Sequence, residues 1–452
     1  MNIIVVGCGK IGLVTVSSLV AEGHNVTVID TDNKIVNDTV NVYDVMGVCG
    51  NGADSDTLLE AGITDADIFI AVTGSDELNM LSCFFAKKMG AKHTVARIRN
   101  TGYNDSSLTL IKQYLDLSVS INPEKLVANE LYNILKIPSA VKIQTFSNRQ
   151  FEMIEISLKP DSKLDGLTLR EVRENFKEKF LVCTVQRNNK TYIPDGNFVL
   201  KGGDIIGLTA SPIELHKLLK KLNILQKQAK NVMIMGASRI SYYLAQRLIS
   251  NGSNVKVIDI DPKRCEEFGE LLPDVDIING DGAQQEILLE EGIDSMDAFV
   301  ALTGMDEENI LLSFFASSLN VPKVISKVNR EEFAHIARNL GLDTIISARN
   351  TVADVIVQYA RAIHNSLGSK VEKLYNLNDG TAEAVEFKVT ADFRGLQTPL
   401  KELQLKSDIL VAGIIRGGRA IIPDGNEAIL AGDKVVVIAA GKKLQDLSDI
   451  LK

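Results

Sequence analysis

Three glycines close to the amino terminus have the spacing of a nucleotide-binding loop: Gly7, Gly9 and Gly12. They follow an apolar, β-branched run at residues 2–6 that predicts a strand, and they open a stretch through Ala21 that predicts a helix. In this setting the first glycine permits a tight turn, the second lets the backbone approach a pyrophosphate, and the third lets the helix pack closely on the strand. The N–H groups at the start of the helix would face the phosphates.

A carboxylate lies where such a loop needs one. Asp30 ends the next predicted strand, 18 residues after Gly12. Its oxygens can accept hydrogen bonds from both hydroxyls of an adenosine ribose, and its charge would repel a 2′-phosphate. The motif therefore favours NAD or a plain adenine nucleotide over NADP. The alternative is a glycine-rich turn in a sheet that binds no nucleotide.

Further polar residues follow the ends of the predicted strands. Thr73 and Gly74 end the fourth strand, and Arg97 ends the fifth. Ligands of open parallel sheets bind at the carboxyl ends of the strands, so these residues belong to one crevice, where Arg97 would face a phosphate or an adjacent domain. Asn51 follows the third strand, near the expected place of an adenine. Lys10, inside the glycine loop, either neutralises phosphate charge or is a solvated cation.

The whole pattern occurs twice. The loop at residues 7–12 reappears at residues 236–241, an offset of 229, and residues 71–86 match residues 301–316 with ten identities in sixteen. Three shorter blocks repeat at nearly the same offset: 28–30 with 257–259, 50–53 with 280–283, and 193–196 with 422–425. Five blocks at one offset indicate a duplicated unit of about 230 residues.

The second copy of the loop has changed. Gly236 remains, whereas Ser238 and Ser241 replace the later glycines, and Asp259 matches Asp30. Serine is small, so the close approach of a phosphate is impaired but not excluded. The second copy therefore holds either a weak or altered nucleotide site, or no nucleotide site. By their match to the first copy, the candidate positions here are Gly236, Ser238, Arg239, Asp259, Asp281, Thr303 and Lys327.

Each unit has two parts. The first alternates strands with helices, which predicts a doubly wound parallel α/β sheet of the Rossmann type. Its expected strands are residues 2–6, 25–29, 45–49, 68–72 and 94–97, and its expected helices include residues 76–89 and 123–135. The second part has short strands at residues 151–158, 180–187 and 204–209, which predict a small α+β domain. The expected domains are residues 1–140, 141–226, 227–368 and 369–452.

The amino-acid composition and the net charge restrict the kinds of partner that the chain can bind. The chain has 452 residues and a net charge of −9, from 49 Lys and Arg against 58 Asp and Glu. Nucleic acid and anionic lipid are bound through basic surface, so the balance argues against either as the main partner. The five cysteines form no CxxC pair, which predicts reduced thiols and no metal site. No apolar run approaches the roughly 18 residues of a membrane span.

Groups that a catalyst would need are missing from the pattern. None of the five histidines has a counterpart in the other copy or lies in a nucleotide loop. The repeated acids Asp76-Glu77 and Asp306-Glu307 begin predicted helices, where the helix dipole is sufficient to explain them. The chain also lacks a P-loop. We therefore expect a nucleotide sensor and not an enzyme, in which binding shifts domain geometry.

These motifs together resemble RCK (KTN) domains: Gly7-Cys-Gly-Lys-Ile-Gly12, the block 71–79, Arg97-Ile-Arg99 and the Ile-Pro-Asp-Gly turn at 193–196. The tandem arrangement over essentially the whole chain is similar to the TrkA family, the cytosolic regulatory subunits of Trk potassium-uptake systems. The resemblance implies a homotetrameric ring beneath a membrane-embedded potassium translocator, with no nucleic acid and no direct membrane insertion. It places the protein in the cytoplasm, peripheral on the inner face of the plasma membrane through its partner.

The resemblance also implies binding of NAD or NADH, or of ATP or ADP, in the first domain. The family's binding positions carry onto Gly7, Cys8, Gly9, Lys10, Ile11, Asp30, Thr73, Gly74 and Arg97. They carry more weakly onto a second set, which is Gly236, Ala237, Ser238, Arg239, Ile240, Asp259, Thr303 and Lys327. A second effector on the small domains, with their paired Arg187 and Arg416, is a further expectation. Two alternatives remain: an NAD-dependent oxidoreductase, indicated by the fingerprint alone, and a regulator of a potassium efflux antiporter.

Overall fold

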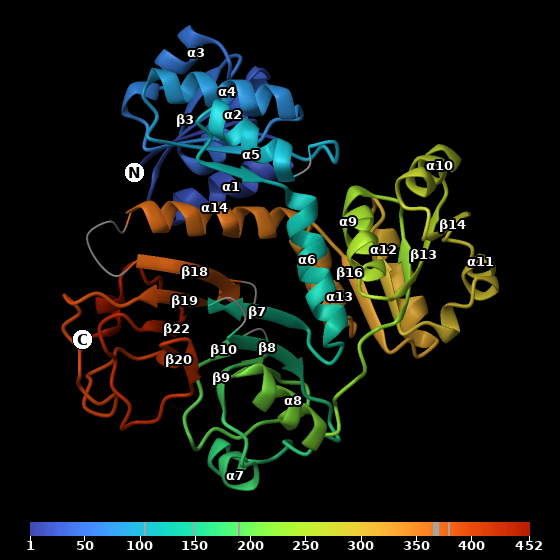
Figure 1. Ribbon diagram of the computed structural model, residues 1–452, viewed down its shortest axis with the longest axis vertical. Coiled ribbons are helices and arrows are strands. Elements are labelled where there is room, and N and C mark those ends of the chain that lie inside the picture. Colours follow the sequence, from blue (N-terminus) through green and yellow to red (C-terminus); the bar gives the residue numbers. More distant parts are fainter. Residues whose placement is uncertain (104, 148–149, 189, 365–369, 378–379) are drawn as a thin grey trace. The chain divides into compact units, whose positions relative to one another are not determined.

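Two parallel and two antiparallel sheets alternate along the chain in the computed structural model (Figure 1). The structure describes residues 1–103, 105–147, 150–188, 190–364, 370–377 and 380–452. Each parallel sheet has six strands and each antiparallel sheet has five. None of the described helices is long and apolar enough to cross a membrane.

The first parallel sheet has the strand order β3-β2-β1-β4-β5-β6. Its strands are β1 (Asn2–Val6), β2 (Asn25–Asp30), β3 (Met46–Cys49), β4 (Ile68–Ala71), β5 (His93–Arg97) and β6 (Val119–Ile121). The helices between them are α1 (Lys10–Ala21), α2 (Asn33–Tyr43), α3 (Ser55–Glu60), α4 (Asp76–Met89) and α5 (Asp105–Tyr114). Because the strand order reverses between β1 and β4, the crevice that receives ligands in such sheets lies at the carboxyl ends of these two strands.

The second parallel sheet repeats this order as β14-β13-β12-β15-β16-β17. Its strands are β12 (Asn231–Met235), β13 (Asn254–Asp259), β14 (Asp276–Asn279), β15 (Ala298–Ala301), β16 (Lys323–Lys327) and β17 (Ile345–Ile346). Its helices are α9 (Arg239–Ile249), α10 (Pro262–Leu271), α11 (Gln285–Glu290), α12 (Asp306–Ser318) and α13 (Glu331–Asn339). The prediction of two doubly wound parallel sheets is therefore confirmed.

Both small domains are antiparallel sheets. The first has the order β10-β9-β11-β8-β7 and the second β18-β19-β22-β20-β21. The elements of the first are β7 (Lys142–Phe146), β8 (Phe151–Ser157), α7 (Leu169–Asn175), β9 (Phe180–Arg187), β10 (Lys190–Tyr192), β11 (Ile205–Ala210) and α8 (Pro212–Lys221). The elements of the second are β18 (Lys370–Leu377), β19 (Ala382–Lys388), β20 (Ile409–Arg416), β21 (Arg419–Ile421), β22 (Lys434–Ala440) and a short 3₁₀ helix at Leu447–Ile450.

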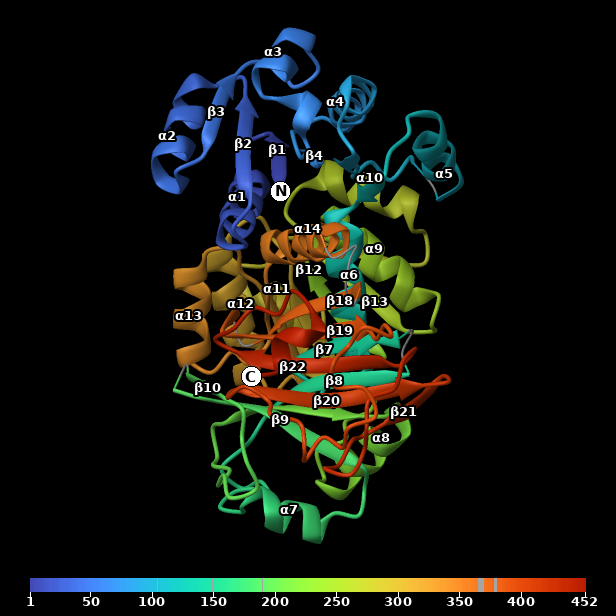
Figure 2. The same cartoon turned by 90° about the vertical axis from the view of Figure 1, so that its left-hand side faces the viewer.

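The two small sheets share one core and lie in neighbouring layers (Figure 2). Phe146 and Phe151 of the first sheet pack with residues of the second, and a Cβ added to Gly413 would lie 2.3 Å from the ring of Phe151. Polar contacts surround this core: Lys142 Nζ donates to the Asn376 carbonyl at 2.9 Å, and the Tyr375 hydroxyl donates to the Thr145 carbonyl at 2.9 Å. The absence of a side chain at Gly413 is what admits Phe151.

The chain forms two compact units that do not coincide with its two sequence halves. One contains residues 1–127 and 347–360, and the other contains residues 128–346 and 361–452. The helices that follow the parallel sheets are α6 (Pro123–Lys136) and α14 (Ala348–His364), and most of each belongs to the unit that holds the parallel sheet of the other half. Thus the Tyr359 hydroxyl on α14 lies 3.3 Å from His93 Nδ1 of the first sheet, and the guanidinium of Arg247 on α9 lies 4.7 Å from the ring centre of Tyr132 on α6. The repeat in the sequence did not predict this assignment of the two helices.

Candidate nucleotide site

The glycine loop is held tightly between β1 and β4. Gly7 is buried with φ of 97°, and a Cβ there would lie 3.0 Å from Thr73 Cα. A Cβ at Gly12 would lie 1.8 Å from the Gly7 carbonyl oxygen, so α1 packs against the loop only because residue 12 has no side chain. Gly9 is different, since no atom lies within 4 Å of a Cβ placed there. The backbone at Gly9 is therefore open to a ligand.

The two helix N-termini differ. Gly9 is the N-cap of α1 and offers no side chain to the unpaired N–H groups of the first turn. In the second copy Ser238 is the N-cap of α9, and its Oγ accepts a hydrogen bond from the Ser241 N–H at 3.2 Å. Ser241 Oγ in turn donates to the Gly236 carbonyl at 2.5 Å. The serines therefore occupy, within the protein, groups that a phosphate would use in the first copy.

Asp30 is positioned at the end of β2 and oriented by backbone donors. Its Oδ2 accepts the Cys8 N–H at 2.8 Å and its Oδ1 accepts the Asp32 N–H at 3.0 Å. Asp259 repeats this arrangement with the N–H groups of Ala237 at 2.7 Å and Asp261 at 2.9 Å. Each aspartate is thus attached to the loop of its own copy.

The Cys8 thiol beside Asp30 is buried. Burial and the charge of Asp30 raise the pKa of Cys8 to about 11, so the side chain is a neutral thiol at physiological pH. The other cysteines, like Cys8, form no disulfide. Among the described residues, no group of three or more His, Cys, Asp and Glu side chains could hold a metal ion.

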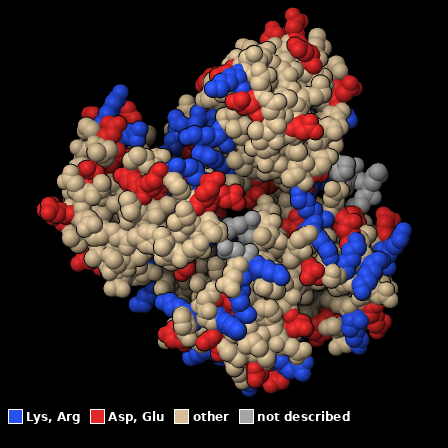
Figure 3. Space-filling model, turned by 180° about the vertical axis from the view of Figure 1, so that it is seen from behind, with Lys and Arg blue, Asp and Glu red and all other residues tan. Residues whose placement is uncertain are grey.

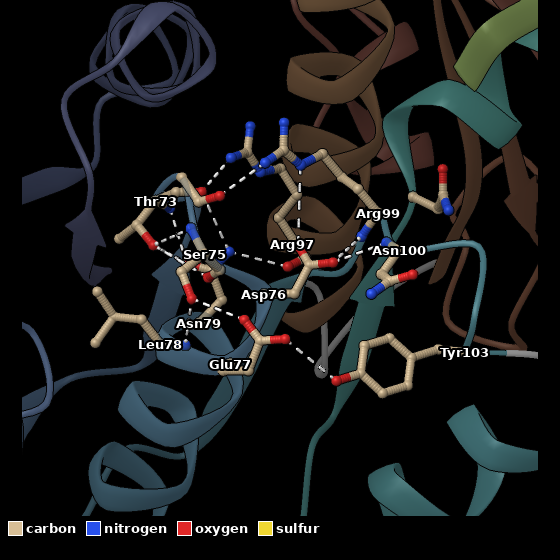
Figure 4. A network of polar contacts seen from close by, with 12 residues as sticks. Thr73, Ser75, Asp76, Glu77, Leu78, Asn79, Arg97, Arg99, Asn100 and Tyr103 are labelled. Carbon is tan, nitrogen blue, oxygen red and sulfur yellow. Dashed lines mark hydrogen bonds and ion pairs between the residues drawn. The ribbon is translucent and has the colours of Figure 1, made fainter. Parts of the chain in front are cut away.

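The ends of β4 and β5 are joined by Asn79, a residue of α4 that the sequence did not single out (Figure 4). Its Oδ1 accepts hydrogen bonds from the Thr73 N–H at 2.8 Å and the Thr73 hydroxyl at 2.7 Å, and its Nδ2 donates to the Arg97 carbonyl at 2.9 Å. The Arg97 guanidinium donates to the Thr73 carbonyl. Asn309 likewise accepts the Thr303 N–H and donates to the Lys327 carbonyl, although the Thr303 hydroxyl donates to Glu308 instead; the recurrence of this asparagine within the matching blocks was the signal available.

Asp76 does more than begin a helix. It is buried, and its Oδ2 accepts the N–H groups of Arg99 and Asn100, both at 2.8 Å. The side chain of Arg99 extends toward the end of β4, where its Nη2 donates to the Gly74 carbonyl at 2.7 Å (Figure 4). The helix dipole is therefore an incomplete explanation of this acid, because Asp76 also holds the loop after β5 against the end of β4.

The second copy keeps this anchor. Asp306 Oδ2 accepts the N–H of Asn329 at 3.1 Å and that of Arg330 at 2.9 Å. Burial would raise the pKa of Asp306, but the hydrogen bonds from Arg330 and Asn329 outweigh it and leave the pKa below the ordinary value. Asp306 therefore stays ionised at neutral pH.

The remaining predicted residues lie at the same edges of the sheets. Lys10 and Arg239 are exposed first residues of α1 and α9. Asn51 Oδ1 accepts the Ala53 N–H at 3.0 Å in the loop after β3, and Asp281 makes the matching bond to Ala283. Ile11 and Ile240 lie in the first turns of the two helices, and Lys327 Nζ donates to the Leu302 carbonyl at 3.2 Å. The order of the strands thus brings the predicted binding residues of each copy to the carboxyl edge of its parallel sheet.

The paired arginines of the small domains are engaged within the protein. Arg187 donates through Nε and Nη2 to the two carboxylate oxygens of Asp204, each at 2.7 Å. Arg416 makes the same paired contact with Asp433, at 2.9 and 2.8 Å. These arginines join the strands of their own sheets, so the expectation that they receive a second effector is not supported.

The fold and the polar residues at the carboxyl edges of the parallel sheets define a class of protein. It has two Rossmann-type domains in tandem, each followed by a small sheet domain. Family models agree, because the TrkA-N domain matches residues 3–114 and 232–348 and the TrkA-C domain matches residues 153–223 and 384–452. A Trk system potassium uptake protein TrkA homolog of Archaeoglobus fulgidus is 31% identical over 453 residues, which cover all of both chains. The chain therefore belongs to the TrkA family.

Other relatives span nearly the same length. The Trk system potassium uptake protein TrkA of Haemophilus influenzae is 28% identical over 451 residues, with 98% of this chain and 96% of that protein covered. The crystal structure of the GsuK RCK domain has a TM-score of 0.64 at 15% identity, covering 97% of this chain and 92% of that chain. The GsuK channel bound to NAD has a TM-score of 0.62 at 15% identity, covering 97% and 76%. At such identities the two structures establish the fold alone.

Proposed function

We propose that this chain is the nucleotide-sensing regulatory subunit of a potassium uptake transporter, and that it binds NAD or NADH, or ATP or ADP, in its first Rossmann-type domain. The observation that carries the proposal is the open glycine loop, with an uncapped helix N-terminus beside Asp30. Membership of the TrkA family and relatives named as potassium uptake proteins support the transport role. The solved GsuK channel bound to NAD supports a nucleotide as the ligand.

The geometry favours the first site over the second. At α1 the first-turn N–H groups have no side-chain acceptor from the cap residue, whereas at α9 the hydroxyl of Ser238 takes one of them. A phosphate must compete with that hydroxyl in the second copy. We infer that a pyrophosphate binds at Gly7 to Gly12 and that Asp30 receives the adenosine ribose.

Histidine positions favour binding over catalysis. His93 is the first residue of β5 and His24 precedes β2, so both lie at the amino ends of strands, opposite the nucleotide edge. A dehydrogenase needs a proton-transfer group beside the nicotinamide. The ligand therefore acts by stabilising one arrangement of the domains, which requires different affinities for two states.

The assembly belongs to the same proposal. We infer a homotetramer that docks on a membrane-embedded potassium translocator of the Trk type and so resides in the cytoplasm, peripheral on the inner face of the plasma membrane. Its proposed domains in chain order are residues 1–140, 141–226, 227–368 and 369–452.

Asp30→Ala tests the nucleotide site, with Asp259→Ala as the matched control. Each change removes a carboxylate that binds two backbone N–H groups, so the structural costs are similar. We expect Asp30→Ala to weaken binding of NAD, NADH, ATP or ADP about tenfold to a hundredfold, because charged hydrogen bonds to the ligand are lost. Asp259→Ala should leave the affinity of the tighter site, which is the first one, unchanged. Calorimetry and ligand-induced thermal stabilisation measure both. Equal losses in the two variants would contradict the assignment to the first site.

Potassium uptake tests the role in transport. Cells lacking this chain but retaining the translocator should take up potassium slowly, and the parent chain should restore the rate. Asp30→Ala should restore it only in part, because the sensor no longer distinguishes nucleotide states. Normal uptake without the chain would refute the transport role, while nucleotide-dependent hydride transfer by the purified protein would favour an oxidoreductase.

A further inference from the structure

The net charge of −9 conceals an uneven distribution. Residues 141–226 contain 14 Lys and Arg against 10 Asp and Glu, so the rest of the chain contains 35 against 48. Acidic and basic side chains are interspersed over much of the face seen in Figure 3. The first small domain is therefore a cationic part of an acidic chain, which the average does not reveal.

Helix α8 presents a basic stripe to solvent. Leu215, Leu218 and Leu219 are buried beneath the helix. Ile213, Lys217 and Lys220 follow one another at intervals of four and three residues, so they share the opposite face, and all three are exposed. Ile213 is 69% exposed, which is unusual for a β-branched apolar side chain at the edge of its own core.

Lysines from two other segments extend this stripe. Lys163 Nζ donates to the Lys221 carbonyl at 2.7 Å, and the Lys179 N–H donates to Glu214 Oε2 at 3.1 Å. Glu214 also pairs with Lys217 at 2.7 Å, and Glu178 pairs with Lys221 at 2.6 Å. We call this region the α8 lysine surface, and it comprises Lys163, Lys179, Lys217, Lys220 and Lys221. The five lysines outnumber Glu178 and Glu214, the two carboxylates whose contacts tie them to this surface.

The fold of the small domain does not require the positive charge of the α8 lysine surface. The second small domain has a comparable five-stranded sheet and the equivalent Arg416–Asp433 pair. Where α8 follows the last strand of the first sheet, residues 442–451 follow the last strand of the second and contain two lysines and two aspartates. The same position is thus basic in one copy and neutral in the other, so the lysines serve something besides folding.

We propose that the α8 lysine surface docks on the anionic lipid headgroups of a membrane. Lysine ammonium groups are flexible point charges suited to a fluid array of phosphates, whereas a folded acidic partner is better met by the rigid fork of arginine. Each lysine near an anionic surface adds about fivefold to the affinity. Ile213, within the stripe, adds apolar contact at the headgroup boundary. This contact goes beyond the proposed function, in which the translocator alone holds the subunit at the membrane.

The test is sedimentation of the full chain with vesicles. We compare phosphatidylcholine alone with phosphatidylcholine containing about one third phosphatidylglycerol, expecting binding only to the second and a steep fall as salt shortens the Debye length. The triple variant Lys217→Gln, Lys220→Gln and Lys221→Gln should bind about a hundredfold more weakly. The control replaces Lys388, Lys401 and Lys406, exposed lysines of the second small domain, by Gln and should bind like the parent.

Three outcomes would overturn the proposal: equal binding to both vesicles, equal losses in the triple variant and its control, or capture by a polyglutamate peptide without binding to anionic vesicles. Ile213→Asn separates the apolar contribution, because it should reduce the binding that persists at high salt. All variants should retain nucleotide-induced thermal stabilisation, so failure of lipid docking and failure of the nucleotide site are seen separately.

Discussion

Replacing Gly12 by alanine is expected to abolish nucleotide binding in the first domain and to destabilise unit 1 (residues 1–127 and 347–360) by about 3 kcal/mol. The new Cβ would lie 1.8 Å from the Gly7 carbonyl oxygen and 2.9 Å from its carbon, so the loop and α1 must move apart. That movement displaces the N–H groups that face the phosphates. Calorimetric titration with NAD and ATP, together with thermal unfolding, measures both effects.

Gly9→Ala is the matched control for the loop. No atom lies within 4 Å of a Cβ there, and its φ of −70° suits alanine, so stability should fall by no more than about 1 kcal/mol, the cost of alanine at the N-cap. Affinity should nevertheless fall, because the methyl group projects where the pyrophosphate approaches. Unchanged affinity in Gly9→Ala, or parent-like stability in Gly12→Ala, would contradict this account of the loop.

Raising the pH from about 7 to 10 is expected to stabilise unit 2 (residues 128–346 and 361–452) by a few kcal/mol through Lys323. Its Nζ is buried and donates to the Ala140 carbonyl at 2.6 Å and the Thr344 hydroxyl at 2.7 Å. Burial lowers the pKa of Lys323 to about 7, and the charge of Asp343 opposes the shift. Between that value and the ordinary lysine pKa, the unfolded chain holds one more proton than the folded chain, so stability rises with pH.

Lys323→Met isolates this effect. The variant loses the titrating group, so its free energy of unfolding should vary less over this pH range than that of the parent. Lys388→Met removes an exposed lysine of the same unit and should keep the parent's dependence. Denaturant unfolding at several pH values measures the slopes, and identical slopes for Lys323→Met and the parent would show that burial does not lower the pKa of Lys323.

Local elements were largely predictable from the sequence. The expected helix at residues 76–89 is α4 and the expected strand at 180–187 is β9, while β3 and β4 each lack one expected end residue. Periodicity is a property of neighbouring residues, which is why it identified these elements. The candidate site was also predictable as a group, because the motif places Gly7 to Gly12, Asp30 and Thr73 at one edge of any parallel sheet.

The limits appear where partners come from distant parts of the chain. The sequence showed that Asn79, Asp76 and the arginine pair Arg187 and Arg416 recur, but not what each side chain contacts. Asn79 binds the ends of two strands, Asp76 holds the loop after β5, and each arginine is engaged by an aspartate of its own sheet. Such pairings depend on packing between elements, which residue type alone does not encode.

The glycine spacing, the aspartate at the next strand end and the duplication were determined by the sequence itself, because each depends on chain order and residue size. The difference between the two loops is local as well, because Ser238 and Ser241 bond each other and the Gly236 carbonyl within six consecutive residues and so close the second loop, whereas the first loop stays open. Tertiary structure decided which compact unit each of the helices α6 and α14 joins. Most of each belongs to the unit of the other half's sheet, because a helix packs on whichever sheet buries its apolar face, and two copies of one fold offer each helix two equivalent surfaces.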